Sequence, residues 1–338
     1  MPLKDYIGFC ILIALVLLMP HLVVSDYYIG VLVFAAFNCL ACIGLCLLMG
    51  YAGQISLGHG AFIAIGAYSS GILTTMFGLS PWTAMVAGAL ASMAIGFALG
   101  IPTLRLKGHY LAMATLGFAS IIHIIAVAAN EITGGPAGLL GIPRLGLFGY
   151  ILDSDISYYY FAWFAVVVGL YFAFNLINSR VGRGLRAIHG SEDAASAVGV
   201  NTNIYKIQIF AVSTVYASVS GSLYAYYVNY IDPGPFDVMH SIVLVTMVAV
   251  GGLRHLWGAV IGAVLLSLLP ELLSMAGAPL KVIGIAYKPD YDILVYGGIL
   301  LLIMMFLPEG LFAALASGAK SGRAFLKKVV KGGSIVRQ

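Results

Sequence analysis

Charged side chains are scarce in this sequence. They make up only 9% of the 338 residues, while hydrophobic residues make up 61%. Soluble globular domains carry about 25% charged and roughly 45–50% apolar residues, so a water-soluble fold is excluded. Apolar runs of near 20 residues recur along the chain, and each is long enough as a helix to cross a hydrocarbon core of ~30 Å. The composition predicts an all-α polytopic membrane protein.

Motifs for catalysis and for phosphate binding are lacking as well. Residues 53–68, GQISLGHGAFIAIGAY, place Ser56 before His59, but the serine comes one position too late for the G-x-S-x-G of a nucleophile elbow and follows no strand. No carboxylate lies in the same run to orient the histidine as a base. Residues 318–321, GAKS, lack the paired Gly-Lys and the preceding strand of a phosphate-binding loop. We therefore expect a chain that is not an enzyme, hydrolyses no ATP itself and carries no cofactor.

Cysteine is rare, and its four positions all fall inside apolar runs. Cys39, Cys42 and Cys46 are spaced to share one face of a helix, so a path for a soft metal is conceivable. Free cysteine more often behaves as a small buried hydrophobe, and we predict no metal site.

Ten apolar runs are predicted to be membrane spans, with boundaries good to a few residues. They cover residues 7–24, 29–49, 54–76, 82–101, 110–129, 158–177, 206–229, 239–252, 258–275 and 291–307. The first run follows Lys4 as in a signal peptide, but no small-x-small cleavage site comes after it, so we expect a retained span. Residues 1–310 are assigned to one transmembrane domain and residues 311–338 to a basic cytoplasmic tail.

The basic residues test this layout independently. With both termini cytoplasmic, fourteen of the 17 Lys and Arg residues face the inside, and only Arg144, Lys281 and Lys288 face the outside. This bias has the direction that the positive-inside rule requires. The tail is expected to bind anionic lipid of the bilayer rather than nucleic acid.

Two predicted spans are unusual. The third contains five glycines between residues 53 and 71, and the eighth has only about 14 residues and ends in Gly251-Gly252. Short or glycine-broken spans at corresponding positions of two chain halves are typical of transporters with inverted repeats. Spans 2–5 and 7–10 would be the repeats, with opposite orientations.

The glycine-rich start of the third span has two interpretations, and the sequence leaves both open. In one, glycines allow close packing or gating, with Ser56 bonded back to its own helix and His59 at the cytoplasmic interface. In the other, an unwound segment lines the pathway, and its polar side chains offer hydrogen bonds to a solute. The candidate pathway or gating residues are Gln54, Ser56, Gly58, His59, Gly60, Phe62 and, as an isolated ionisable residue in the fifth span, His123. We expect His123 to be a bundle-facing hydrogen-bonding residue rather than a ligand for the solute.

Residues 180–205 form the longest polar stretch on the predicted inner side. Arginines dominate its first half, a helix start follows at Ser191 with Glu192 and Asp193 in the first turn, and Gly199 is a stop signal. The stretch predicts one amphipathic helix, or two short ones joined at Gly190, along the inner membrane face. The alternative is a solvated connecting loop.

Five blocks of sequence identify a resemblance that covers nearly the whole chain. They are GYAGQISLGHGAFIAIGAY (residues 50–68), LRLKGHYLAMATLGF (104–118), ITGGPAGLLGIPR (132–144), GRGLRAIHGSEDAASAVGVN (182–201) and VGGLRHLWGAVIGA (250–263). In these blocks the chain resembles the LivM branch of the branched-chain amino acid ABC importer permeases (the LivH/LivM permease family). The resemblance implies a multi-pass subunit of the bacterial inner membrane, paired with a LivH-type permease. It also implies two cytoplasmic ATPase subunits that bind ATP and Mg, and a periplasmic solute-binding protein.

The resemblance also gives roles to two polar segments. Asp193-Ala194-Ala195 stands where the ABC permease coupling motif E-A-A-x3-G-x9-I-x-L-P begins, and Gly199 and Ile209 follow at the motif's spacing, but the final L-P is absent. That departure puts in doubt only the geometry of the flanking helix. The implied ATPase-coupling residues are Arg186, His189, Glu192, Asp193, Ala194, Ala195 and Gly199. The turn-rich loop 130–144 is either a connector or, by resemblance, a contact for the binding protein through Thr133, Gly134, Gly135, Pro136 and Gly138.

Several alternatives stay open at this stage. Relatives of the same permease type use urea, short amides or aromatic carboxylates in place of leucine, isoleucine and valine. A secondary carrier or channel would work without an ATPase, although the scarcity of acidic residues within the spans argues against a proton-coupled one. An integral-membrane enzyme would need the serine at position 56.

Overall fold

Long helices make up most of the described chain. A computed structural model describes residues 3–22, 25–103, 109–147 and 150–281, together with the isolated positions 297, 298, 301, 311 and 312. The long helices are α1 (Leu3–Leu22), α2 (Asp26–Cys46), α3 (His59–Thr75), α4 (Pro81–Thr103), α5 (His109–Ala128), α7 (Asp155–Asn178), α10 (Thr202–Val228), α11 (Val238–Gly251) and α12 (Leu256–Lys281). A π-helical turn, Leu47–Tyr51, extends α2. The all-α fold predicted from composition is confirmed.

Shorter elements connect these helices. They are α6 (Asn130–Thr133), α8 (Arg180–Gly190), α9 (Glu192–Ala197), and two 3-10 turns, Gly135–Ala137 and Gly234–Phe236. Strand β1 (Leu139–Leu140) pairs antiparallel with β4 (Tyr230–Ile231), and β2 (Gly146–Leu147) pairs with β3 (Tyr150–Ile151).

A helix lies at each of the first nine predicted spans. Within the described residues, five helical stretches are long and apolar enough to cross a membrane: α1, α2 with its π turn, α4, α5 and α7. The third span differs from its prediction, because residues 53–58 are not helical and α3 begins only at His59. Apart from positions 297, 298 and 301, the tenth predicted span lies outside the described residues, as does all of the basic tail after residue 312.

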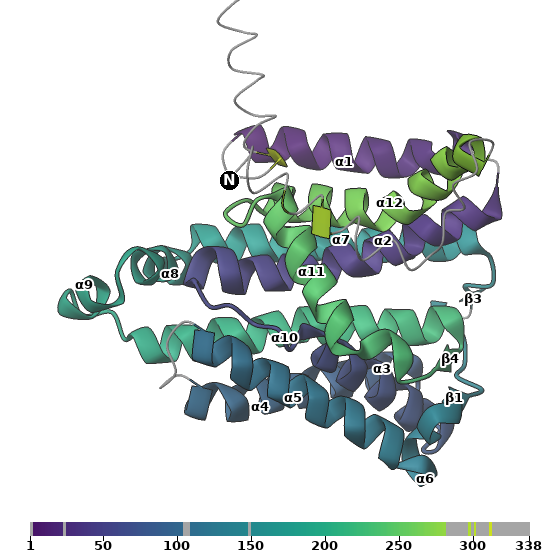
Figure 1. Cartoon of the computed structure of the whole chain (residues 1–338), viewed down its shortest axis with the longest axis horizontal. Helices are drawn as coiled ribbons and strands as arrows, with labels where there is room; N and C mark the ends of the chain where they lie inside the picture. The colour runs from purple at the N-terminus through teal and green to yellow at the C-terminus, as the bar shows by residue number, and fades with distance from the viewer. Residues whose placement is uncertain are drawn as a thin grey trace, which may run out of the picture.

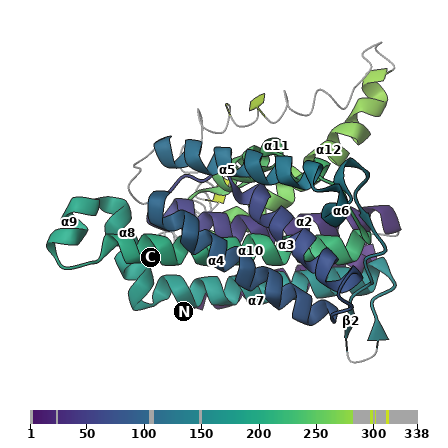
Figure 2. The same cartoon turned by 90° about the horizontal axis from the view of Figure 1, so that it is seen from below.

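The helices form two layers. Figure 1 shows α1, α12, α7 and α2 in one layer and α10, α3, α4 and α5 in the other, with α11 crossing between them. The long α10 packs against α3 and α4 and also against α2, so it joins the layers. Helices α8 and α9 extend from one end of the molecule, while α6 and the small strands lie at the opposite end (Figure 2).

Glycines bring α3 and α10 into backbone contact. A Cβ added at Gly66 would collide with the carbonyl oxygen of Ser218, and one at Gly221 would collide with the carbonyl oxygen of Ile63. The hydroxyl of Ser222 donates to the Gly66 carbonyl at 3.1 Å across the same crossing. Small residues allow such close approach, which is the main source of helix association within a bilayer.

Because the atoms facing Gly66 belong to the backbone, a Gly66→Ala substitution must separate the two helices. We expect it to destabilise the protein by about 1–3 kcal/mol, measured as a lower melting temperature of the purified protein in detergent. Gly117 is the matched control, since it is also helical but has no atom within 4 Å of its added Cβ. Gly117→Ala should leave the melting temperature unchanged or slightly raised. A melting temperature unchanged by Gly66→Ala would contradict the close crossing.

Candidate functional site

The first turns of α3 and α11 meet inside the molecule. The Gly60 backbone N–H donates to the Ser241 hydroxyl at 2.9 Å. A Cβ added at Gly60 would lie 2.8 Å from that hydroxyl oxygen and 3.1 Å from the carbonyl oxygen of Asp237. The N-termini of two helices that are far apart in sequence are therefore adjacent.

Each of these two helices is preceded by backbone that is largely non-helical and runs deep into the structure. A Cβ added at Gly71 would lie 3.1 Å from the Ile231 side chain, and Gly71 is about 16 Å along α3 from Gly60. Residues 231–237 therefore run beside α3 over that length before α11 begins. At the far end of α11, the Cys46 thiol donates to the Leu253 carbonyl at 3.3 Å. Helices α3 and α11 thus extend from a shared meeting point toward opposite ends of the molecule.

The meeting point combines helix-end charge with unpaired polar groups. Helix N-termini carry a partial positive charge, and at α11 the Asp237 carboxylate accepts from the His240 backbone N–H at 2.9 Å. His59 is fully buried, and neither of its ring nitrogens has a hydrogen-bond partner among the described residues. The Gln54 side-chain oxygen is likewise buried without a described partner.

The other candidate pathway residues lie in this region or on the helices around it. Ser56 precedes α3 instead of lying in it, and its hydroxyl accepts from the Gly58 N–H at 3.3 Å. The His59 side chain is enclosed by protein. Phe62 is buried, with its ring centroid 5.2 Å from that of Phe118. His123 is half-buried on α5, and its Nδ1 has no partner among the described residues.

Sequence reasoning missed three residues of this site. Ser241 and Asp237 hold the meeting point, and the Thr115 hydroxyl accepts from the Leu57 N–H at 3.0 Å, which ties the extended segment to α5. Asp237 was detectable as an N-cap directly before an apolar run. Nothing in the local sequence around Ser241 or Thr115 indicates their partners.

The polar segment 180–205 folds as two short helices joined at Gly190, one of the two predicted arrangements. The Ser191 hydroxyl caps α9 by accepting from the Ala194 N–H at 3.2 Å, and Gly199 follows the helix with φ +85°. Helix α9 extends away from the layers (Figures 1 and 2), and the Val198 side chain just after it is 78% exposed.

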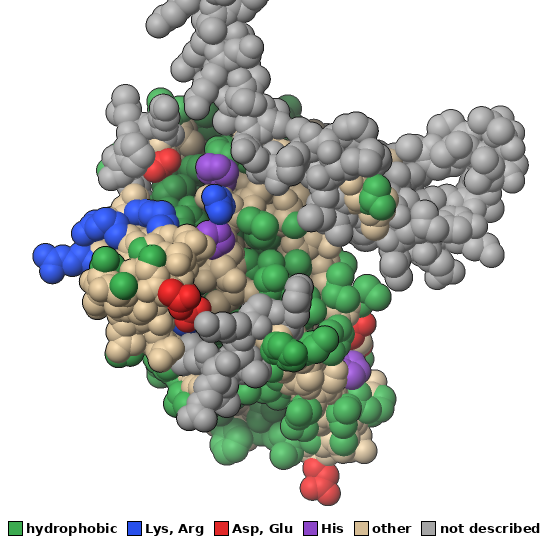
Figure 3. Space-filling view, turned by 60° about the vertical axis from the view of Figure 1, so that its left-hand side comes forward, with side chains coloured by type: hydrophobic (Ala, Val, Ile, Leu, Met, Phe, Trp, Pro, Cys, Tyr) green, Lys and Arg blue, Asp and Glu red, His purple; other side chains and the backbone are tan. Residues whose placement is uncertain are grey.

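The residues of this segment that were predicted to couple to the ATPase divide into exposed and internally bonded ones. Asp193, Ala194 and Gly199 are exposed, whereas Ala195 is buried. The Arg186 guanidinium donates to the Ile177 carbonyl at 2.9 Å. Glu192 pairs with the buried Lys206 at 2.6 Å, which ties α9 to the start of α10. Lys, Arg and His side chains gather over this end of the molecule (Figure 3).

His189 of α8 contacts two segments that lead to the meeting point, namely the segment before α3 and the loop after α11. Its Nε2 lies 3.0 Å from Nη2 of Arg254, in the loop after α11, and its Nδ1 lies 2.9 Å from where a Cβ on Gly53 would be. Gly53, with φ +66°, begins the extended segment before α3. Burial, and then the positive charge of Arg254, lowers the pKa of His189. The neutral ring, with its proton on Nδ1, can therefore accept from Arg254.

The loop 130–144 lies at the opposite end. Thr133 and Gly135 are buried: the Thr133 hydroxyl donates to the Ala126 carbonyl at 2.7 Å and accepts from the Gly135 N–H at 3.1 Å. Gly134 and Gly138 both have φ +76° and are half-buried, and Pro136 is exposed. Of the five predicted contact residues, Pro136 is thus the one that presents most of its surface.

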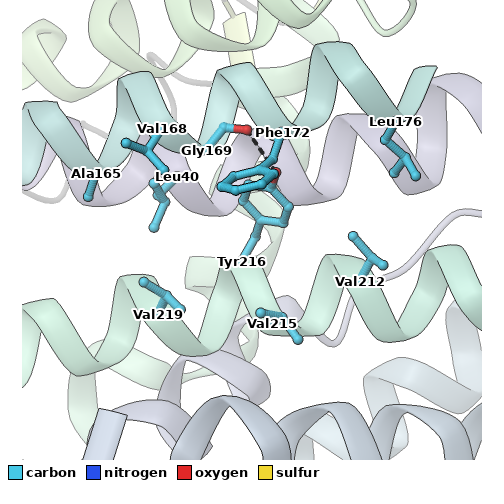
Figure 4. A pocket seen from close by; sticks show the side chains of 10 residues that line it. All are labelled: Leu40, Ala165, Val168, Gly169, Phe172, Leu176, Val212, Val215, Tyr216 and Val219. Carbon is cyan, nitrogen blue, oxygen red and sulfur yellow. Dashed lines mark hydrogen bonds between the residues drawn. The ribbon is translucent and has the colours of Figure 1, made fainter. Parts of the chain in front are cut away.

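An apolar groove of about 420 Å³ lies between α7 and α10 (Figure 4). Its one hydroxyl, that of Tyr216, donates to the Gly169 carbonyl at 2.8 Å. The remaining lining side chains are aliphatic or aromatic, among them Leu40, Phe172 and Val215. This groove has no free polar group to hold a polar solute.

The cysteines act as packing residues in the structure. The thiols of Cys39 and Cys42 lie 3.7 and 3.8 Å from backbone carbonyls of α12 and α11, respectively. No group of three or more possible metal ligands occurs within the described part of the chain.

Comparison with known proteins places this geometry in context. The family model described as branched-chain amino acid transport system / permease component matches residues 27–304. The chain is 32% identical over 292 residues to the high-affinity branched-chain amino acid transport system permease protein LivM of Salmonella typhimurium, and 31% identical to that of Escherichia coli K12. Each match covers 80% of this chain and 66% of the relative, so the chain spans slightly less than two thirds of their length.

A weaker similarity extends to a sugar permease. The ribose import permease protein RbsC of Escherichia coli K12 is 25% identical over 284 residues, covering 81% of this chain and 86% of the relative. No solved structure matches the chain significantly.

The contact between His189 and Arg254 predicts a pH dependence of stability. The folded chain holds the His189 pKa below that of the unfolded chain. The neutral His189 therefore adds to the free energy of unfolding above the ordinary histidine pKa of about 6.5, and this contribution is lost as the pH falls below that value. His189→Gln keeps an acceptor for Arg254 but does not titrate. We expect its melting temperature to fall less than that of the wild type between about pH 7.5 and pH 5.5.

The control for this comparison is His255→Gln. His255 is exposed and lies next to Arg254 in sequence, so its replacement should keep the wild-type dependence on pH. An equal fall in melting temperature for the wild type and both variants would show that the His189 contact does not contribute.

Proposed function

Because this chain belongs to the branched-chain amino acid transport system permease family, we propose that it is the membrane-spanning subunit of an ATP-driven importer for leucine, isoleucine and valine. The observation that carries the proposal is the family match over residues 27–304. The greater identity to the LivM permeases, 32% against 25% for the ribose permease, favours amino acids over sugars. The family is one of transport permeases, which fits a role that is not enzymatic.

We further propose ten spans with both termini in the cytoplasm of a bacterial cell and the bilayer as the inner membrane. Inverted repeats would then comprise α2–α5 and α10–α12 with residues 291–307. Support comes from α3 and α11, which occupy corresponding positions, both follow non-helical backbone, and meet at their N-termini. Discontinuous helices of this kind are typical of transporter repeats that surround a solute pathway.

The solute pathway is proposed to pass the meeting point of α3 and α11. Irregular backbone at membrane depth is stable only where it is enclosed by protein or lines a cavity. Within residues 53–58, Gln54, Ser56 and Gly58 are buried and Leu57 is tied to α5, whereas Gly53 and Ile55 are exposed. The predicted residues Ser56, Gly58, Gly60 and Phe62 belong to this pathway, and His123 borders it from α5.

Helices α8 and α9 are proposed to couple the chain to the ATPases. Asp193, Ala194 and the exposed Val198 would dock into an ATPase subunit, while Arg186 and Glu192 hold the two helices on the bundle. Movement of α8 would reach α3 and α11 together, because His189 contacts both Gly53 and Arg254. Such coupling requires that the docked ATPase distinguish two conformations of this chain energetically.

The complete importer is proposed to contain this chain, a LivH-type permease, two ATPases that bind ATP and Mg, and a periplasmic binding protein. The loop 130–144 would contact the binding protein, with the exposed Pro136 at its surface. The buried Thr133 and Gly135 would act by holding the loop in shape.

The docking proposal predicts a change in assembly. Val198→Asp places a charge on the most exposed apolar residue of the proposed docking surface, and burying an unpaired charge is costly. We expect recovery of the ATPase subunits with the affinity-purified permease to fall by about tenfold or more. Asp193→Lys should have the same effect. Glu131→Lys, an exposed charge reversal at the opposite end, should leave recovery normal, and normal recovery with Val198→Asp would rule out this surface.

The pathway proposal predicts a transport defect without loss of insertion. Gly60→Leu must push the start of α3 away from Ser241 and Asp237. With the partner subunits present, we expect uptake of radiolabelled leucine to be lost while the amount of the chain in the membrane is unchanged. Gly117→Leu faces open space and should transport normally. Normal uptake by Gly60→Leu would reject the meeting point as part of the pathway.

A further inference from the structure

A second cavity, of about 290 Å³, lies between α2, α3, α10 and α11. It includes His240, the third residue of α11, and the 3-10 turn that precedes this helix. Its volume is close to the lower end of the roughly 300–1,000 Å³ found for small-molecule sites. The cavity therefore suits a solute of only a few heavy atoms.

The wall of the cavity is mainly aromatic. Phe34, Phe37, Tyr224 and Phe236 line it, and the Tyr224 ring lies with its centroid 5.5 Å from that of Phe236 and 5.9 Å from that of Phe34. Ile63 of α3 completes the apolar part. Phe34 is 40% exposed, so the cavity reaches the molecular surface beside it.

Three polar side chains interrupt this wall, and their hydrogen bonds leave specific atoms free. The Asn38 amide nitrogen donates to the Ser267 hydroxyl at 2.9 Å, which leaves its oxygen as an acceptor. The buried Ser220 hydroxyl donates to the Phe37 carbonyl at 2.8 Å and keeps lone pairs to accept with. The His240 ring has no hydrogen-bond partner within the described residues.

The polar groups match the two charged ends of a free amino acid. Two acceptor oxygens, together with aromatic faces, suit an ammonium group. The Asp237 carboxylate already caps the N-terminus of α11 by accepting from the His240 backbone N–H, so the group available to a solute carboxylate is the His240 imidazole, which can donate an N–H. The apolar groove of Figure 4 contrasts with this cavity, because its only hydroxyl is already used.

We propose that this cavity binds the transported solute as a zwitterionic aliphatic amino acid. The carboxylate is held by His240, the ammonium by Asn38 and Ser220, and the side chain by the aromatic wall and Ile63. The identity of the solute rests on the proposed function, whereas the position of the site rests on the cavity itself.

Protection of a cysteine from labelling tests occupancy directly. Phe34→Cys places a thiol at the exposed edge of the cavity, in a Cys10→Ser background because Cys39, Cys42 and Cys46 are buried. The full importer is reconstituted without nucleotide and treated with a small water-soluble thiol reagent. With L-leucine at about ten times its Kd, labelling should slow about tenfold. Equal concentrations of L-glutamate or ribose should leave the rate unchanged, as should leucine for a Val215→Cys control in the apolar groove.

Filling the cavity tests its part in transport. Ile63→Phe adds bulk inside the cavity, and Val215→Phe adds similar bulk to the apolar groove. We expect Ile63→Phe to reduce leucine uptake by about tenfold or more while ATP hydrolysis stimulated by the binding protein continues. Val215→Phe should transport normally. Retained ATP hydrolysis shows that the filled variant is folded and assembled.

The outcomes separate the cavity from the proposed function. If the wild type takes up leucine but leucine does not slow labelling of Phe34→Cys, the cavity is not the solute site. The proposed import function would still hold. Protection by ribose instead of leucine would overturn the amino acid as occupant. Absence of leucine uptake by the wild-type importer would overturn the proposed function, and the labelling rates would then still decide whether leucine occupies the cavity.

Discussion

The hydrogen bond from the Gly60 N–H to the Ser241 hydroxyl joins the two halves of this chain. At the start of a helix the first backbone N–H groups have no partner within the helix, and inside a bilayer no water replaces one. The structure meets this requirement for α3 with a side chain from the first turn of α11. The Gly60 backbone can come this close only because it carries no side chain. The two non-helical segments and the cavity beside α11 all adjoin this contact.

The two ends of the molecule are connected to the contact of Gly60 with Ser241 in different ways, one through a side chain and the other through backbone pairing. On the side of α8, His189 lies between Gly53 and Arg254, so one side chain contacts the segments leading to α3 and from α11. At the other end, backbone pairing between β1 and β4 holds Ile231, the first residue of the segment 231–237 that runs beside α3 to the start of α11. Because these links are short and the crossing of α3 with α10 is tight, a displacement of α8 has a direct physical route to the meeting point.

Sequence patterns located most helices but did not predict the surroundings of the side chains just before and at the start of α3. The apolar runs predicted the long helices at the first nine spans because bilayer solvation requires long apolar helices whatever their packing. The two helices around Gly190 also followed from local signals, a Ser191 cap and a stop at Gly199. The full burial of His59 within the protein, by contrast, was not predicted. Its environment is set by α5 and α11, which no local pattern encodes.

The sequence by itself determined the class of the protein, the long helices, the family and the two short helices on either side of Gly190. These follow from composition, periodicity, caps and motifs, which act over a few neighbouring residues. Only the tertiary structure decided which polar groups meet: Gly60 with Ser241, His189 with Arg254, and Asn38 with Ser267. The partners are separated by 181, 65 and 229 positions. Their pairing depends on how the layers pack, and the free oxygens and imidazole around the cavity are defined only after that packing is complete.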